Sequence, residues 1–239
     1  MDRSIRYNVY MHPAQPLLIM IGSIVLLYIL SRFTLNGLFR LLQRTFYKDR
    51  HVYILIAFFF FPGTLLHELA HYGAAILLLL EVKSLHLLPE WKGNELKLGK
   101  VIYIRKDFFR GILVGVAPVI AGVVFFLVFS AFRIFPSPNI WVNIASVYIL
   151  LVVSTMMFSS RQDLIDFVYI LPIIIIIAGL FFIFKINPLS LLGGGRLSPL
   201  SLLSAANPYI ERIDTMLFIT IAVHMVTVIL LKIINHRRR

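Results

Sequence analysis

The chain has 239 residues, of which 59% are hydrophobic and only 14% are charged, whereas soluble domains average about 45–50% apolar and about 25% charged residues. This excess excludes an ordinary soluble protein. Apolar runs of about 20 residues are long enough to cross a hydrocarbon core of about 30 Å as helices, so they predict a polytopic membrane protein in contact with a lipid bilayer. The net charge of +12 is attributed to loops and tails that meet anionic lipid, and no nucleic-acid partner is expected. The absence of cysteine excludes disulfides and thiolate metal sites.

Residues 1–51 are expected to hold an N-terminal helix and a basic interfacial helix. The first apolar run extends from Leu17 to about Leu30. From Phe33 to Arg50, apolar side chains recur at helical spacing with basic residues between them, which is typical of an amphipathic helix lying in the membrane interface.

Residues 52–167 are expected to form the membrane core. An apolar run from Val52 to Leu80 is interrupted by Pro62-Gly63. Residues 81–110 are more polar and contain alternating stretches, which predict a short β-hairpin with its turn at or near Lys92-Gly93-Asn94. Further helices are expected over residues 111–135 and 140–158.

Residues 168–239 are expected to hold the C-terminal transmembrane helices, which are predicted at about 167–184 and 215–234. A flexible loop over 185–214, with a glycine triplet and three prolines, separates them. The chain is therefore predicted to be an all-α polytopic membrane protein with about six transmembrane helices and a short β-hairpin insert between helices two and three. Six crossings place both termini on one side of the membrane, and the basic residues nearly balance between the two faces, so the orientation stays open.

The segment from His67 to His71 reads H-E-x-x-H. On a helix, this spacing places two imidazoles on one face, where they can bind one Zn²⁺, with Glu68 beside them as the base. Zinc lowers the pKa of water to about 7, and a carboxylate takes the water's proton and later transfers it to the leaving amine. The pattern predicts a zinc hydrolase with His67 and His71 as metal ligands and Glu68 as the catalytic residue.

The place of this motif inside an apolar run favours a functional role. An acidic side chain at the centre of a membrane helix costs about 2.5–3.5 kcal/mol, and such residues usually mark functional sites. The alternative is that neighbours in a helix bundle satisfy the three polar side chains of His67, Glu68 and His71, which leaves their metal-ligand order unexplained.

A catalytic zinc usually has three protein ligands and one open position, so a third ligand is expected elsewhere in the chain. Asp163 and Asp166 lie in a short polar break between two apolar segments. Asp163 is the first choice for the third ligand and Asp166 is the second. His224, alone within the last helix, is interpreted as a hydrogen-bonded structural residue.

Several of these motifs together resemble those of a known protein family. The apolar segment from Phe61 to His71, the β-rich insert after it and Gly115-Val116-Ala117-Pro118 in a later helix resemble the site-2 protease family of intramembrane zinc metalloproteases. The resemblance covers about residues 52–167, which it assigns as the catalytic membrane core. It implies that His67 and His71 bind zinc, that Glu68 is the general base, and that Asp163 takes the place of the family's distal aspartate ligand.

Two departures indicate a divergent member of that family. Asp163 lies between Gln162 and Leu164 instead of in an Asn-Pro-Asp-Gly or Leu-Asp-Gly setting, and no Asn follows Ala117-Pro118 at the family's usual position. The resemblance implies a transmembrane protein as substrate. Because a helix hides its carbonyls, that substrate must unwind into an extended strand, and the alternating residues from Val101 to Ile104 are expected to supply a sheet edge for it. The expected location is a prokaryotic cell membrane.

Two other functions stay open at this point. Zinc proteases that trim prenylated or misfolded membrane proteins also carry H-E-x-x-H on a membrane helix, but their later glutamate ligand has a spacing that Glu211 and Asp214 do not match. A non-catalytic scaffold or transporter-like relative would use the same residues to hold a metal or a partner helix.

Overall fold

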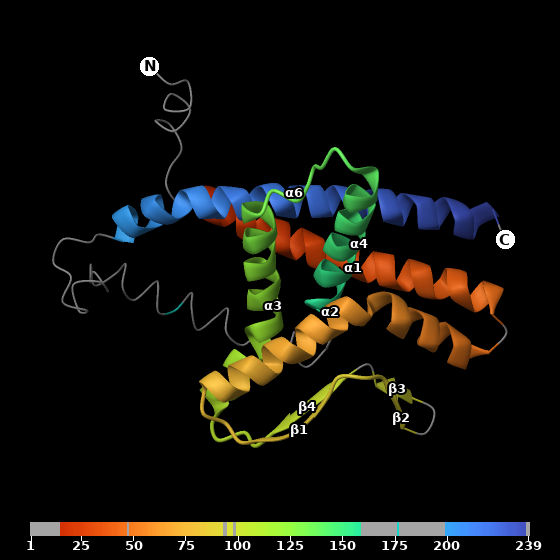
Figure 1. The fold of residues 1–239 in the computed structure, drawn as a ribbon, viewed down its shortest axis with the longest axis horizontal. Coiled ribbons are helices and arrows are strands. Elements are labelled where there is room, and N and C mark those ends of the chain that lie inside the picture. Colours follow the sequence, from red (N-terminus) through yellow and green to blue (C-terminus); the bar gives the residue numbers. More distant parts are fainter. Residues whose placement is uncertain are drawn as a thin grey trace.

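A computed structural model describes residues 15–46, 48–92, 95–97, 99–158, 176 and 199–237 of the chain. Helices dominate this part, together with a small β-hairpin (Figure 1). The elements are α1 (Gln15–Thr45), α2 (Asp49–Leu77), β1 (Val82–His86), β2 (Glu90–Lys92), β3 (Glu95–Lys97), β4 (Lys100–Tyr103), α3 (Phe108–Ala131), α4 (Ile140–Met156) and α6 (Pro199–Arg237).

Four of these helices are long and apolar enough to cross a membrane: α1, α2, α3 and residues Ala205–His236 of α6. Apolar helices of this length support the prediction of a membrane protein. Helix α4 has 17 residues, which is the lower limit for a spanning helix. Apart from Ile176, the helix expected over 167–184 lies outside the described residues.

The N-terminal helix is longer than the sequence pattern suggested. Instead of a break near Leu30 and a separate interfacial helix over 33–50, α1 continues without interruption to Thr45, and α2 begins at Asp49. The hydroxyls of Ser31 and Thr34 donate to carbonyls one turn earlier, at 2.8 and 3.0 Å. These polar residues are therefore satisfied inside the helix and do not end it.

The prediction of a flexible loop over 185–214 is wrong for residues 199–214, because α6 begins at Pro199. Proline is favoured in the first turn of a helix, where its missing N–H has no partner to lose. Pro208 lies inside the same helix, a position that membrane helices tolerate when neighbours satisfy the freed carbonyl.

Helices α1 and α6 lie side by side and run in the same direction (Figure 1). Leu27 packs in one cluster with Leu217 and Ile221, and near the other end the Arg44 guanidinium donates to the backbone carbonyl of Asn235. The pairing therefore advances along both helices together, which makes them parallel. Helices α3 and α4 run across this pair (Figure 1).

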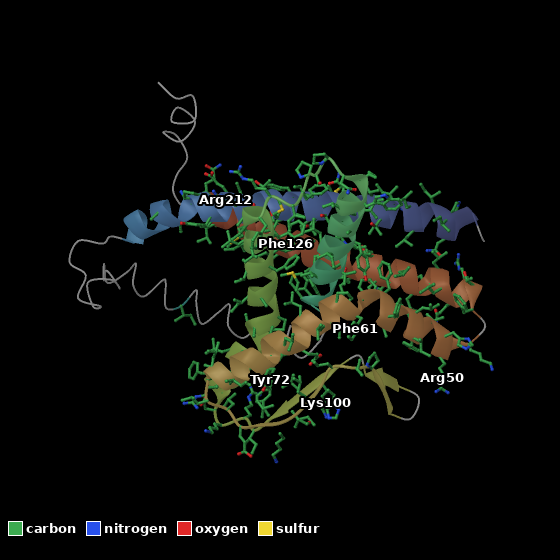
Figure 2. The ribbon with its side chains drawn as sticks, in the orientation of Figure 1. Arg50, Phe61, Tyr72, Lys100, Phe126 and Arg212 are labelled. Carbon is green, nitrogen blue, oxygen red and sulfur yellow. The ribbon has the colours of Figure 1, made fainter. Side chains whose placement is uncertain are left out.

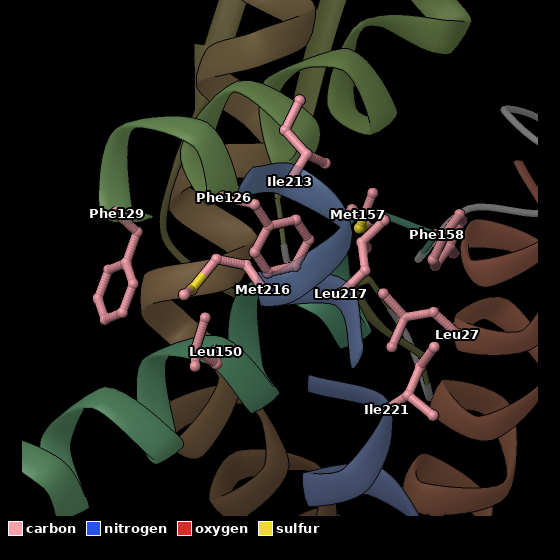
Figure 3. Close-up of a cluster of buried hydrophobic side chains, with 10 residues drawn as sticks. All are labelled: Leu27, Phe126, Phe129, Leu150, Met157, Phe158, Ile213, Met216, Leu217 and Ile221. Atoms are coloured by element: carbon pink, nitrogen blue, oxygen red, sulfur yellow. The ribbon is translucent and has the colours of Figure 1, made fainter. Parts of the chain in front are cut away.

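The main hydrophobic core lies where four helices meet. Leu27 of α1, Phe126 of α3, Leu150 of α4 and Leu217 of α6 each have no exposed surface, and Figure 3 shows them within one cluster. A second cluster packs Val52, Ile56 and Phe60 of α2 against α4. Helix α4 thus contributes to both clusters and links α2 to the rest of the bundle.

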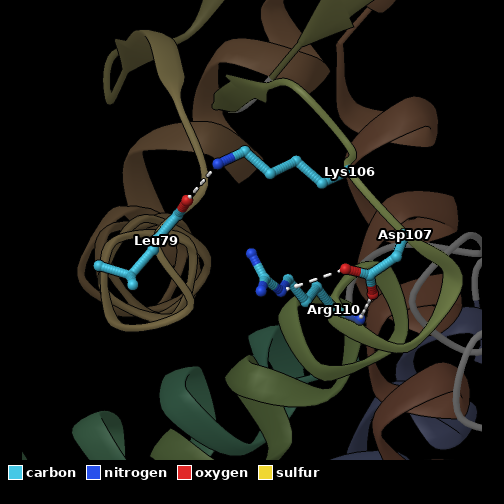
Figure 4. Close-up of polar contacts among 4 residues, drawn as sticks. All are labelled: Leu79, Lys106, Asp107 and Arg110. Carbon is cyan, nitrogen blue, oxygen red and sulfur yellow. Dashed lines mark hydrogen bonds and ion pairs between the residues drawn. The ribbon is translucent and has the colours of Figure 1, made fainter.

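The predicted β-hairpin is present between α2 and α3. Strand β1 pairs with β4 and β2 pairs with β3, both antiparallel, so the chain turns back between Lys92 and Glu95. Leu79 follows α2 with a positive φ of 56°, and its carbonyl accepts from Lys106 Nζ at 3.0 Å. Asp107 caps α3 by accepting from the Arg110 N–H at 2.8 Å (Figure 4). The bond from Lys106 to Leu79 joins the two ends of the hairpin next to the C-terminal end of α2, which carries the H-E-x-x-H segment.

Candidate metal centre

The histidine pair continues the buried face of α2. Val52, Ile56 and Phe60 are buried at helical spacing, and His67, at 4% exposure, follows on the same side of the helix. The face that holds α2 against α4 therefore carries the first imidazole into the protein interior. In Figure 2, Phe61 and Tyr72 mark the ends of this part of α2, and Lys100 marks the strand beside it.

His71 is oriented by a backbone group of α3. Its Nδ1 lies 2.8 Å from the carbonyl oxygen of Val114, a residue with only 1% exposure. A carbonyl accepts hydrogen bonds and does not donate them, so Nδ1 carries the proton and a neutral His71 has its lone pair on Nε2. Metal-binding histidines are held in this way, by a bond from the nitrogen that does not bind the metal.

The distance between the two imidazoles fits a shared metal ion. The Nε2 atoms of His67 and His71 are 3.1 Å apart, and their rings are almost perpendicular, with an interplanar angle of 86°. Two nitrogens that share a tetrahedral zinc at about 2.0–2.1 Å stand about 3.3 Å apart. The two Nε2 atoms, which lie within hydrogen-bond distance of each other, thus have a separation close to the one that a shared zinc requires.

Glu68 lies beside this pair under the hairpin. Its side chain is buried, at 8% exposure, and Gly99 immediately before β4 packs directly over it. A Cβ atom at Gly99 would lie 2.5 Å from Glu68 Cγ and 3.0 Å from Oε1. Only a residue without a side chain allows the hairpin backbone to come this close to the carboxylate.

The C-terminal end of α4 reaches the same level of α2. Gly63 packs against it so closely that a Cβ there would lie 2.5 Å from the Val152 carbonyl oxygen. One residue later, Thr64 Oγ1 is 3.5 Å from the sulfur of Met156. Thr64 precedes His67 by three residues, or about 4.5 Å along the helix axis. The C-terminal end of α4 therefore lies close to the part of α2 that carries the histidine pair.

The predicted third ligands, Asp163 and Asp166, lie outside the described residues. Within the part of the chain that the structure describes, no group of three His, Cys, Asp or Glu side chains could hold a metal ion. His67 and His71 lie together, and Glu68 follows His67 in the same helix with its side chain buried. Glu211 is exposed on α6, and Asp214 is buried on that helix.

His224 is a structural residue, as the sequence suggested. Its Nδ1 is 2.8 Å from Thr34 Oγ1 of α1, and its Nε2 is 2.8 Å from Ser154 Oγ of α4. Both ring nitrogens are engaged and the side chain has no exposed surface. His224 thus connects three helices through buried hydrogen bonds.

Sequence reasoning missed two features of the site, the Val114 carbonyl and Gly99. No side-chain pattern identifies a carbonyl partner, but a glycine at the start of a predicted strand is a signal of close backbone approach. Comparisons with family models, with curated proteins and with solved structures return no match to this chain.

Proposed function

We propose that the chain is an intramembrane zinc metalloendopeptidase that hydrolyses peptide bonds in or near transmembrane segments of substrate proteins. One observation carries the proposal: the Nε2 atoms of two histidines lie 3.1 Å apart on a helix of membrane-spanning length, with the buried Glu68 beside them. A carboxylate and two imidazoles in this order form the core of a zinc hydrolase.

His67 and His71 would hold the ion. When bound, Zn²⁺ supplies a Lewis acid that polarises the substrate carbonyl and lowers the pKa of water. Glu68 accepts the proton of the attacking water and delivers it to the leaving amine. The bond from His71 to Val114 keeps the imidazole in one tautomer, and the hairpin over Glu68 restricts the positions that the carboxylate can take.

We assign the third ligand to Asp163, with Asp166 as the second choice. Phe158 is the last described residue of the α4 end, and Asp163 follows five residues later, a distance that an extended chain covers up to about 17 Å. Because α4 ends beside Thr64, the chain that follows it is long enough to bring either carboxylate to the histidine pair. Replacing Asp163 by Ala should remove bound zinc, and Asp166→Ala should not; the reverse result would exchange the two assignments.

A substrate helix must unwind before its carbonyls become accessible, because helical hydrogen bonds occupy them. Among the described residues, β4 forms a strand pairing with β1 alone, on one of its two edges. An unwound substrate strand adding to β4 would lie next to Gly99 and Glu68.

The test is cleavage of a transmembrane peptide by the purified chain in lipid nanodiscs. Replacing Glu68 by Gln should lower the cleavage rate by about 10²–10⁴-fold, as expected for the loss of a general base, while the zinc content stays unchanged. Undiminished cleavage by this variant would overturn the proposal. A wild-type chain that binds zinc but cleaves no peptide would favour a metal-holding scaffold.

A further inference from the structure

A second candidate site lies away from the metal centre, at the C-terminal end of α3. A cavity of about 410 Å³ opens there between the end of α3, the following turn and α6. Its lining includes the hydroxyl-bearing Ser130, the two basic residues Arg133 and Arg212, and the apolar side chains of Phe135 and Met216. This volume is within the range of pockets that bind small molecules. Figure 2 shows Arg212 on α6, close to the end of α3.

The two arginines give the cavity a positive charge. None of the described lining residues is acidic, and neither guanidinium has a hydrogen-bond or ion-pair partner within the described part of the chain. Glu211, the nearest acid in the sequence, is exposed and does not line the cavity. Guanidinium groups bind phosphate oxygens in a bidentate manner, with a geometry that few other anions match as well.

The backbone at Arg133 is a second, independent indication. Its φ is 51°, in the left-handed region that favours glycine and disfavours residues with a Cβ atom. Glycine is the usual residue at this position after a helix, so the chain keeps an arginine where its backbone would prefer another residue. Such strain is typical of residues retained for binding.

The turn that carries Arg133 is held in place by side-chain hydrogen bonds. The Asn143 amide oxygen accepts from the Ser137 N–H at 2.7 Å, and its Nδ2 donates to the Ser137 carbonyl at 2.9 Å. These bonds hold the segment that follows Arg133 and contributes Phe135 and Pro136 to the cavity lining.

The surroundings of the cavity match the headgroup region of a membrane. Phe132, next to Arg133, is 72% exposed. An exposed apolar ring beside a basic side chain suits the boundary between the hydrocarbon core and water. Arg212 also lies 20 residues before Lys232 on α6, or about 30 Å, which is the thickness of the hydrocarbon core.

We propose that this cavity binds a phosphate group, with Arg133 and Arg212 as its two ligands and Ser130 as an additional donor. The phosphate belongs to the headgroup of an anionic phospholipid or to free inorganic phosphate. The inference is independent of the metal centre.

Calorimetric titration of the purified chain in phosphatidylcholine nanodiscs tests the proposal, with short-chain phosphatidylglycerol and inorganic phosphate as separate probes. Arg133→Gln and Arg212→Gln should each weaken binding by about tenfold or more. As a control, Arg40→Gln removes the same charge from an exposed position near the C-terminal end of α1 and should leave binding unchanged. Binding of phosphatidylglycerol alone identifies the headgroup as the ligand, and binding of inorganic phosphate identifies the free ion.

Arg133→Gly guards against a folding artefact. Glycine suits the left-handed backbone, so this variant should unfold at the same temperature as the wild type or higher, yet bind about tenfold more weakly or worse. Absence of binding to both probes, equal effects of the three Gln variants, or wild-type affinity in Arg133→Gly would each overturn the proposal.

Discussion

At the scale of single residues, the candidate catalytic carboxylate is positioned by a residue that has no side chain. Gly99 brings the hairpin backbone onto Glu68, and a methyl group there would lie 2.5 Å from Glu68 Cγ and 2.9 Å from Cδ. One of the two groups must then move. Small displacements of a catalytic group are costly, because about 1 Å of misplacement reduces rates by about 10²-fold.

Replacing Gly99 by Ala should therefore reduce peptide cleavage by about tenfold or more, mainly in kcat, while zinc stays bound. The matched control is Gly73→Ala on α2, where an added Cβ meets nothing within 4 Å. Peptide-cleavage kinetics and metal analysis of the two variants provide the measurement. Full activity of Gly99→Ala would show that the hairpin does not restrain Glu68.

At the scale of elements, the helix that carries the candidate metal centre, α2, packs closely against α4. Gly63→Ala places a Cβ 2.5 Å from the Val152 carbonyl oxygen and 2.8 Å from Met156 Cγ. The helices must separate, and overpacking of this kind costs about 1–3 kcal/mol. The expected result is a lower thermal unfolding midpoint, measured on the purified chain in detergent.

Gly73→Ala again provides the comparison, because it makes the same chemical change in the same helix without a contact. Alanine is favoured over glycine inside a helix by about 1 kcal/mol, so this variant should be as stable as the wild type or more so. Equal stability of Gly63→Ala and Gly73→Ala would contradict the close α2–α4 contact.

At the scale of the whole molecule, parallel packing of α1 and α6 has a consequence for membrane topology. Both are long and apolar enough to span, so their first residues should lie on one side of the membrane and their last residues on the other. If both helices cross the membrane, the number of crossings from α1 to α6 is odd, whereas the sequence predicted about six. The C-terminal ends of α1 and α6 lie together, and exposed basic residues gather there: Arg40, Arg44, Lys48, Arg50 and Lys232. Cytoplasmic segments of membrane proteins are enriched in basic residues, so we expect this end on the cytoplasmic side.

The chain contains no cysteine, so single cysteines report topology without background. A membrane-impermeant maleimide should label Gln15→Cys from the side opposite to Lys48→Cys and His236→Cys, with the latter two accessible from the cytoplasm. Labelling of Gln15→Cys and His236→Cys from the same side would restore an even number of crossings.

Some of this architecture follows from sequence and some depends on contacts between distant segments. Helical periodicity alone places His67 and His71 on one face, and alternation predicts the hairpin. The beginning of α6 was missed because Pro199 and Pro208 resemble loop residues, although one begins the helix and the other is tolerated within it. The Val114 carbonyl and the contact of Gly99 with Glu68 arise from tertiary packing, which local patterns do not encode.

The zinc content of the purified chain tests the central claim most directly. One zinc per chain is expected in the wild type and in Glu68→Gln, and its loss is expected in His67→Ala and His71→Ala. His224→Leu should keep the metal, because both nitrogens of His224 already bind hydroxyl groups. A wild-type chain without zinc, or zinc retained after both His67 and His71 are replaced, would contradict the assignment of the metal centre.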